Sequence, residues 1–273
     1  MTAHDWISMF WAWGGCAALL ALLWIDQVRR KDATLVDVGW TLGLGASGVW
    51  FALSASDGSA LNRWLAAGIA TLWTIRLASH LLVDRVLGHR GSRGEDSRYA
   101  YLRSYWGPRA NPWFFGFYQL QAFAAAGLAV PYLVLSRATN DQLSAAQWAG
   151  LAIIASSIAF ESIADRQLAA WRANPAHKGK TCRTGLWAWS RHPNYFFEWL
   201  FWVGLALAAS PSPLALAAWI SPAVILWLVT KVSGIPWAEQ QSRRSRGDDY
   251  RRYQAEVSAF FPRPPRRTTQ GNP

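Results

Sequence analysis

Residues 181–198 read Thr-Cys-Arg-Thr-Gly-Leu-Trp-Ala-Trp-Ser-Arg-His-Pro-Asn-Tyr-Phe-Phe-Glu, and they pass directly from a basic connection into an apolar segment. Asn194 and Glu198 therefore fall where water meets an apolar phase, a place where a charged cofactor can meet an apolar substrate. Pro193 suits the first turn of a helix. A helix that begins near Asn194 carries Glu198 one turn further along the same face, so we expect the two side chains to point the same way.

Composition indicates the class of protein. The chain has 273 residues, of which 52% are hydrophobic and 19 are tryptophan, yet its mean hydropathy is only +0.05. Apolar blocks alternate with basic ones, which predicts an all-α, polytopic membrane protein. Apolar residues cover whole segments and not one stripe, which disfavours a soluble helical bundle. Seven segments approach the length of a membrane span: 6–25, 34–53, 61–83, 112–135, 146–164, 194–209 and 214–230.

Lysine and arginine are distributed unevenly among the connections. Of 27 such residues, 24 fall in the connections 26–33, 84–111 and 165–193 and in the tail from Lys231 onward. With seven spans these four segments lie on one side of the membrane, which the positive-inside rule makes the cytoplasmic side. We therefore expect an outside N-terminus and a cytoplasmic C-terminus, in a bacterial inner membrane.

Charge and cysteine content exclude other classes. The net charge of +11 is explained by the positive-inside bias and by anionic lipid headgroups, and no nucleic-acid motif accompanies it, so nucleic acid is not an expected partner. Cys16 and Cys182 are far apart in the sequence, and we expect neither a disulfide nor a metal site. We expect one membrane domain over 1–262, monomeric among membrane lipids, and a disordered basic tail over 263–273.

Polar residues inside the predicted spans are candidates for function. Asp37 lies about one turn inside the second span, where a carboxylate is costly unless it is neutral, paired or hydrated. Pairing with Arg76 of the third span would keep it ionised, whereas burial alone would favour the neutral acid, and both interpretations stay open. Tyr118 of the fourth span can face a pocket. Residues 43–48 match the dinucleotide fingerprint G-x-G-x-x-G but lack its strand and helix, so we attribute them to close helix packing.

Two further stretches place charges beside the membrane. At the end of the fifth span, Glu161, Asp165 and Arg172 are spaced so that they share one helical face. The connection 84–111 mixes both signs of charge, and it either covers a nucleotide or is a solvated loop. Its polar residues include Arg90, Arg93, Glu95, Asp96, Arg98 and Tyr99.

The order of these motifs resembles the steroid 5-alpha-reductase family of integral membrane reductases, and more closely its bacterial branch. The resemblance covers most of the chain, and it implies seven spans, NADPH bound from the cytoplasm, and reduction of a carbon–carbon double bond conjugated to a ketone. The substrate would be a steroid or a similar apolar lipid enone. The motifs that carry it are Glu161-x3-Asp165-x6-Arg172, Arg183-x-Gly185-Leu-Trp and Ser190-Arg-His-Pro-Asn194-Tyr-x2-Glu198.

The resemblance also implies roles for individual residues. Asn194 and Glu198 are expected at the nicotinamide end of NADPH, and arginines such as Arg172 and Arg183 at its phosphates. Many cytoplasmic arginines, and no acidic residue placed to demand a free 2′-hydroxyl, favour NADPH over NADH. The whole expected cofactor-binding set is Arg98, Glu161, Asp165, Arg172, Arg183, Arg191, His192, Asn194, Tyr195 and Glu198.

Catalysis requires a hydrogen-bond donor at the substrate carbonyl, because negative charge develops on that oxygen as the hydride is transferred. The steroid enzymes use a carboxylic acid in the second span and a tyrosine in the third. Asp37 matches the acid, but the third span here contains no tyrosine. The second donor is therefore open among Tyr118, Tyr99 and His80, and the steroid itself stays open as the substrate.

Two other classes of protein fit parts of the sequence. A membrane S-adenosylmethionine-dependent methyltransferase of the isoprenylcysteine type has a similar Arg-His-Pro-x-Tyr motif and a similar tail, here with Glu239, Tyr250 and Tyr253. Asn194 together with Glu198 favours the reductase. A non-catalytic lipid binder on the same scaffold needs no donor residues and stays an alternative.

Overall fold

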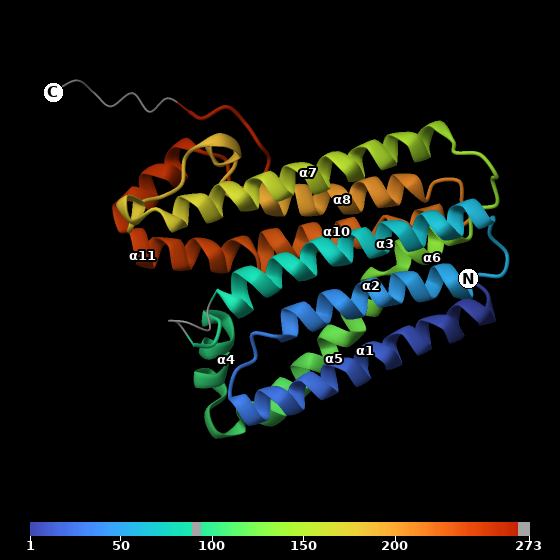
Figure 1. The fold of residues 1–273 in the computed structure, drawn as a ribbon, viewed down its shortest axis with the longest axis horizontal. Coiled ribbons are helices and arrows are strands. Elements are labelled where there is room, and N and C mark those ends of the chain that lie inside the picture. Colours follow the sequence, from blue (N-terminus) through green and yellow to red (C-terminus); the bar gives the residue numbers. More distant parts are fainter. Residues whose placement is uncertain (89–93, 267–273) are drawn as a thin grey trace. The chain divides into compact units, whose positions relative to one another are not determined.

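The computed structural model describes residues 1–88 and 94–266, and every regular element in that part of the chain is helical (Figure 1). The predicted all-α class is therefore confirmed. Arg90 and Arg93 of the connection after the third predicted span lie outside the described residues. The same holds for residues 267–273 of the predicted tail.

The chain divides into two compact units. The first unit is Met1–Gln147 with Ala208–Ser221, and the second is Trp148–Leu207 with Pro222–Pro273. The helices of the first unit are α1 (Ala3–Arg30), α2 (Val36–Ser54), α3 (Ala60–Leu81), α4 (Ser97–Trp106), α5 (Ala110–Leu128), α6 (Val130–Ser136) and α9 (Ala215–Ala218), with the short turns η1 (Leu82–Leu87) and η2 (Gly107–Arg109).

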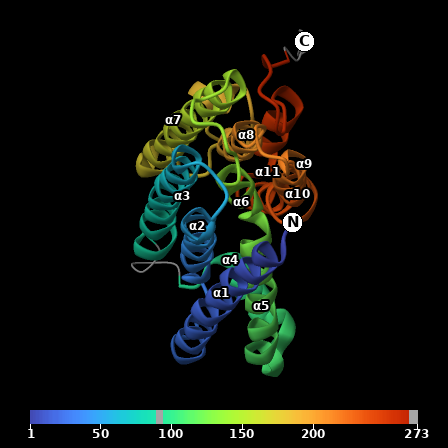
Figure 2. The ribbon, with the colours of Figure 1, turned by 90° about the vertical axis from the view of Figure 1, so that its right-hand side faces the viewer.

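Helix α2 lies at the centre of the first unit, in contact with α1, α3, α5 and α6 (Figure 2). Its glycines allow that close approach. A β-carbon on Gly45 would lie 1.6 Å from Thr74 Oγ1 of α3, and one on Gly48 would lie 2.8 Å from the Tyr132 ring of α6. Both separations are well inside van der Waals contact. The glycines of residues 43–48 thus serve helix packing, as predicted.

A buried ion cluster closes one end of the first unit. Arg137, just after α6, is 6% exposed and pairs with Asp5 of α1 and with Asp57 in the connection between α2 and α3. Asp5 also forms a capping box with Thr2 at the start of α1. Two carboxylates thereby compensate one buried guanidinium, and the cluster ties together three segments that are distant in sequence.

Replacing Arg137 with methionine should destabilise the protein strongly. Asp5 is 1% exposed and would lose its cation, which we expect to cost about 3–5 kcal/mol. The measurement is the unfolding temperature in detergent. Asp57 is 63% exposed, so Asp57→Asn should lower that temperature much less. If Arg137→Met and Asp57→Asn lowered the unfolding temperature equally, burial of these side chains would not determine how much their ion pairs stabilise the protein.

The second unit contains most of α7 (Ala145–Ala173) and α10 (Ile220–Trp227), together with α8 (Pro193–Ala208) and α11 (Ile235–Glu256). Gly247, with φ of 53°, interrupts α11 and divides it into two halves. After α11 the chain turns back, and the amides of Arg263 and Arg266 donate to the carbonyls of Trp189 and Glu256 at 2.9 and 2.8 Å. The short turns of this unit are η3 (Pro175–His177), η4 (Gly185–Ala188) and η5 (Leu228–Val232).

Six helical stretches of the described chain are long and apolar enough to cross a membrane, which makes this a multi-pass membrane protein. They cover six of the seven predicted spans. The remaining predicted span, 194–209, forms α8, which has 16 residues. At 1.5 Å per residue that helix is about 24 Å long, shorter than the about 30 Å hydrocarbon core of a bilayer. The six stretches are Ala3–Arg30, Val36–Ser54, Ala60–Leu87, Ser97–Ser136, Ala145–Ala173 and Ala215–Glu256.

Candidate functional site

The first unit gathers charged side chains around Asp37, in the first turn of α2. The Asp37 carboxylate accepts hydrogen bonds from Arg98 Nη2 at 2.6 Å and from Tyr99 Oη at 2.5 Å, and it forms an ion pair with Arg85. Arg85 comes from η1, and Arg98 and Tyr99 begin α4. Three segments therefore meet at one carboxylate.

These contacts favour an ionised Asp37. Two partly buried guanidinium groups flank the carboxylate, and a neutral acid would remove the counter-charge that they share, leaving Arg98 with Asp96 at 3.0 Å. The cations are Arg85 and Arg98, which occupy the role that the sequence suggested for Arg76. An ionised carboxylate accepts hydrogen bonds and cannot donate one, so its direct role as a donor to a carbonyl is disfavoured.

Helix α4 is fixed to the connection between α1 and α2. The Ala33 amide donates to Glu95 Oε1 at 2.8 Å, and the Asp96 amide donates to Thr34 Oγ1 at 2.9 Å. The Asp96 carboxylate in turn caps α4 by accepting from the Arg98 amide at 2.9 Å. The described part of the connection 84–111 is thus a folded support that presents Arg98 and Tyr99 to Asp37.

Tyr118, one of the candidates for the second donor to the substrate carbonyl, lies buried in α5. Its hydroxyl donates to the Ala33 carbonyl at 3.4 Å, and its ring packs edge-on against Phe114. The side chain is 1% exposed. Of the tyrosines considered as second donor, Tyr99 is the one that the structure brings into contact with Asp37.

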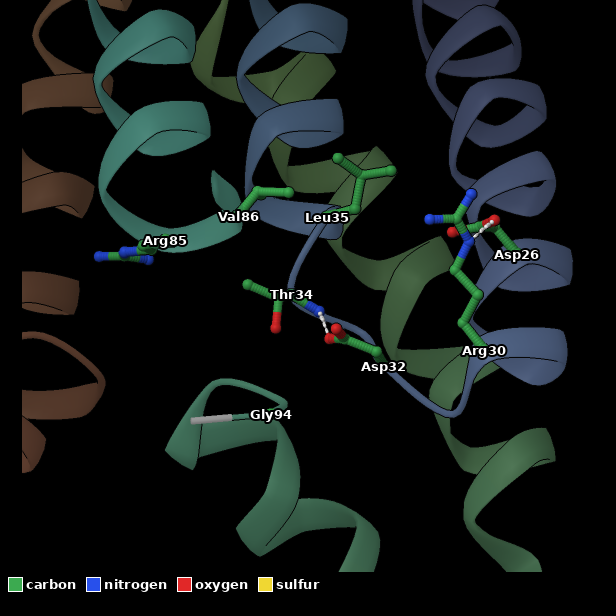
Figure 3. A pocket seen from close by; sticks show the side chains of 8 residues that line it. All are labelled: Asp26, Arg30, Asp32, Thr34, Leu35, Arg85, Val86 and Gly94. Carbon is green, nitrogen blue, oxygen red and sulfur yellow. Dashed lines mark hydrogen bonds and ion pairs between the residues drawn. The ribbon is translucent and has the colours of Figure 1, made fainter. Parts of the chain in front are cut away.

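A polar cavity of about 210 Å³ adjoins the Asp37 cluster and shares Arg85 with it (Figure 3). Asp26 and Arg30 of α1 form an ion pair of 2.7 Å on one side of it. Half of its lining residues are charged, and Leu35 and Val86 add apolar surface. The lining residues are Asp26, Arg30, Asp32, Thr34, Leu35, Arg85, Val86 and Gly94.

In the second unit, Asn194 at the start of α8 is fixed against α7. Its Nδ2 donates to Asp165 Oδ1 at 3.1 Å, and its Oδ1 accepts from the Tyr195 amide at 3.0 Å. Glu198 lies one turn further along α8 and accepts from Trp202 Nε1 at 2.9 Å. The structure therefore brings together Asn194 and Asp165, two residues that the sequence assigned to one site from separate motifs.

Helix α7 carries the acidic and basic residues of the first motif. Glu161, Asp165 and Arg172 lie on this one uninterrupted helix, as their spacing predicted. Glu161 precedes Asp165 by one turn, and Arg172 is exposed near the end of the helix. Their shared helix places Arg172 about two turns from the Asn194–Asp165 contact.

Arg191 binds the C-terminal segment. Its Nε donates to Glu239 Oε1 at 2.7 Å, and its Nη1 donates to the carbonyls of Gln254 and Val257 at 3.0 and 2.5 Å. Its Nη2 lies 2.5 Å from the same Glu239 oxygen. Most of its N–H groups are therefore engaged within the protein, which makes Arg191 an organising residue.

His192 shares the Glu239 carboxylate and stacks on a neighbouring ring. Its Nε2 lies 3.5 Å from Glu239 Oε1, and its ring centroid is 5.5 Å from that of Tyr195. Burial lowers the pKa of the imidazole below its usual value, although Glu239 opposes the shift. The His192 ring is therefore neutral at pH 7.

Arg183 is also oriented by α11. Its Nη1 donates to Glu256 Oε2 at 2.8 Å and its Nη2 to the Asp249 carbonyl at 2.7 Å, with the guanidinium over the Tyr253 ring. Close by, Gly185 has φ of 60°, and a β-carbon there would lie 2.3 Å from Gln167 Nε2. Glycine is therefore required at this turn between Arg183 and the Arg-His-Pro motif.

The comparison with known protein families covers most of the chain. The family model described as "Protein of unknown function (DUF1295)" matches residues 23–257. The chain belongs to this family. It is a family of membrane proteins related to the steroid 5-alpha-reductases, in agreement with the resemblance in the motifs.

A relative from Schizosaccharomyces pombe, named only as an uncharacterized protein, is 27% identical over an alignment of 269 residues that covers 89% of this chain and 76% of the relative. No solved structure matches the chain. The range matched by the DUF1295 model, 23–257, includes Asp37, Asn194 and every side chain that contacts them, and it ends just after α11.

Sequence analysis did not assign Arg85 or Glu239 to the site of the expected reductase. Arg85 was one basic residue among six in its connection, and nothing in its spacing links it to Asp37. Glu239 entered only through the methyltransferase alternative. One signal was available for it, because Glu239 is the single acidic residue in the first half of a basic helix.

Replacing Asp37 with asparagine should destabilise the first unit. The change leaves Arg85 and Arg98 facing a neutral amide, which we expect to cost about 3–5 kcal/mol. Asp26→Asn is the matched control, because its partner Arg30 is 56% exposed and the pair should contribute little. An Asp37→Asn variant that unfolds at the temperature of the unchanged protein would instead indicate a neutral carboxylic acid.

Proposed function

We propose that this protein is a membrane reductase that uses NADPH to reduce a carbon–carbon double bond conjugated to a ketone in an apolar, steroid-like or lipid substrate. The observation that carries the proposal is the contact between Asn194 and Asp165, with Glu198 one turn further along α8. The related steroid 5-alpha-reductases are expected to hold the nicotinamide end of NADPH at the matching positions.

The residues of the second unit fit NADPH by their chemistry. Asn194 has an amide of fixed orientation, and such a group can pair with the carboxamide of nicotinamide. Arg172 is exposed and supplies a guanidinium group for phosphates, and Arg183 does so from its exposed part, since it stays 32% exposed beside its partners on α11. Arg191 is engaged by Glu239 and by backbone carbonyls, so we assign it to shaping the site. When bound, NADPH supplies the hydride.

Within the first unit, Tyr99 and Arg98 are the donors whose chemistry suits polarisation of a carbonyl. Both donate to Asp37, whose negative charge orients them, and because Tyr99 carries one hydroxyl proton it exchanges Asp37 for the substrate oxygen as its acceptor when it polarises the carbonyl. A substrate oxygen that gains negative charge is stabilised by such preoriented donors, each worth roughly 3 kcal/mol. Asp37 then acts as a positioning group, and Tyr99 takes the donor role that the sequence left open between it, Tyr118 and His80.

Tyr99→Phe should lower the kcat for enone reduction about 100-fold, because it removes one donor to the developing charge. Tyr118→Phe is the matched control. It removes a hydroxyl whose hydrogen bond to the Ala33 carbonyl is long, 3.4 Å, and it should change kcat little. Turnover is measured as enone-dependent NADPH oxidation. A loss confined to Tyr118→Phe would identify Tyr118 as the donor.

Cofactor identity is tested by thermal unfolding of the purified protein. A ligand that binds only the folded state stabilises it by about 2.7 kcal/mol at one hundred times its Kd. NADPH should raise the unfolding temperature, NADH should do so less, and Asn194→Ala should reduce the NADPH effect. Asn174→Ala, at an exposed cap in the same unit, should not. The same NADPH response in both variants would remove Asn194 from the site.

One observation favours methyl transfer as the second candidate function. The Arg-His-Pro motif and the tail meet at Glu239, and Tyr253 Oη donates to the Trp187 carbonyl at 2.5 Å. These are the residues on which the methyltransferase resemblance rests. Protection of the protein by S-adenosylmethionine, with none by NADPH, would replace the reductase proposal with this one.

We further propose seven spans in a bacterial inner membrane, with α8 as the sixth, the N-terminus outside and the C-terminus in the cytoplasm. The distribution of basic residues supports this orientation. A topology reporter fused after Lys231 should read as cytoplasmic, and one within 136–145 should read as outside. Two reporters on the same side would exclude this arrangement.

A further inference from the structure

Glu239 of α11 contacts both Arg191 and His192 of the Arg-His-Pro motif. Its Oε1 accepts from Arg191 Nε at 2.7 Å and lies 3.5 Å from His192 Nε2. Its Oε2 accepts from Gln254 Nε2 at 2.8 Å. The carboxylate is 13% exposed, so these partners stabilise its charge and water contributes little.

The same contacts join the two halves of α11. Glu239 precedes the break at Gly247, whereas Gln254 follows it. Arg191 also binds the second half of α11 and the residue after it, because its Nη1 donates to the carbonyls of Gln254 and Val257. A single carboxylate thus holds the motif and both halves of the broken helix in one arrangement.

The chain after α11 encloses the start of α8. The Arg191 amide donates to the Ser258 carbonyl at 2.8 Å, and Ser190 Oγ donates to the Phe260 carbonyl at 2.8 Å. The Phe260 ring packs against Trp199 of α8 with centroids 5.8 Å apart. The residues directly before Pro193 are therefore held by side chains of α11 and by the backbone that follows it.

We propose that Glu239 is a positioning residue for the cofactor site, and that it acts on Asn194 through Arg191 and His192. These two residues immediately precede Pro193 and Asn194, so their anchoring fixes where α8 begins. The Asn194 amide then meets Asp165 in one orientation. This inference rests on the proposed role of Asn194 toward NADPH, and it gives Glu239 no contact with the cofactor.

The test compares Glu239→Gln with Asp248→Asn in the full-length protein. Asp248 is an α11 carboxylate that is 83% exposed, so it controls for loss of one negative charge. Two quantities are measured: hydrogen exchange of the amides of residues 190–196 without cofactor, and the affinity for NADPH from thermal protection. Glu239→Gln should speed exchange in 190–196 and weaken NADPH binding about tenfold, and Asp248→Asn should change neither.

Gln254→Leu provides a milder variant if Glu239→Gln does not fold. It removes only the bond to Glu239 Oε2, and it should shift both quantities in the same direction by less. Faster exchange with unchanged NADPH affinity would overturn the proposal, since Glu239 would then serve stability alone. Unchanged exchange would also overturn it.

Failure of the proposed function gives a different result. The unchanged protein would then show no protection by NADPH, whereas exchange in 190–196 would still report whether Glu239 anchors the start of α8. Replacing NADPH with S-adenosylmethionine in the same comparison would show whether that anchoring controls another cofactor.

Discussion

A charged side chain in a membrane-spanning helix needs a counter-charge from its own protein, because the hydrocarbon core offers neither water nor salt. Two charge centres in the described part of the first unit meet this requirement with partners from distant segments. Asp37 is held by Arg85 and Arg98, and Arg137 by Asp5 and Asp57. Because each centre draws on three segments, the positions of η1, α4 and the ends of α1 and α6 all depend on charge compensation.

The helical class and the helix positions could be predicted from the sequence because long apolar runs leave few alternatives to a membrane helix. The packing role of Gly45 and Gly48 was also predictable, since small residues in a span permit close approach. The bounds of α8 were predictable as well. Pro193 marks its start, and Ser-Pro-Ser-Pro at 210–213 follows its end at Ala208, one residue before the predicted end of this span.

The sequence indicated which residues belong to the candidate sites better than it indicated which of them contact one another. Spacing within one helix placed Glu161, Asp165 and Arg172 correctly on α7. Partners on other segments do not follow from spacing, and for Asp37 the sequence suggested Arg76 of the third span. The folded connection beyond η1 supplies Arg98 and Tyr99 instead, through caps and backbone bonds that leave no periodic pattern.

The cluster at Arg137 has a consequence for how the protein is made. Asp5 and Arg137 are 132 residues apart, so the ribosome completes α1, α2 and α3 before the cation exists. At about 5–20 residues per second, the two carboxylates wait on the order of ten seconds for it. Until Arg137 is made, Asp5 has to be protonated or hydrated, and the ion pair that joins α1 to the end of α6 can form only afterwards.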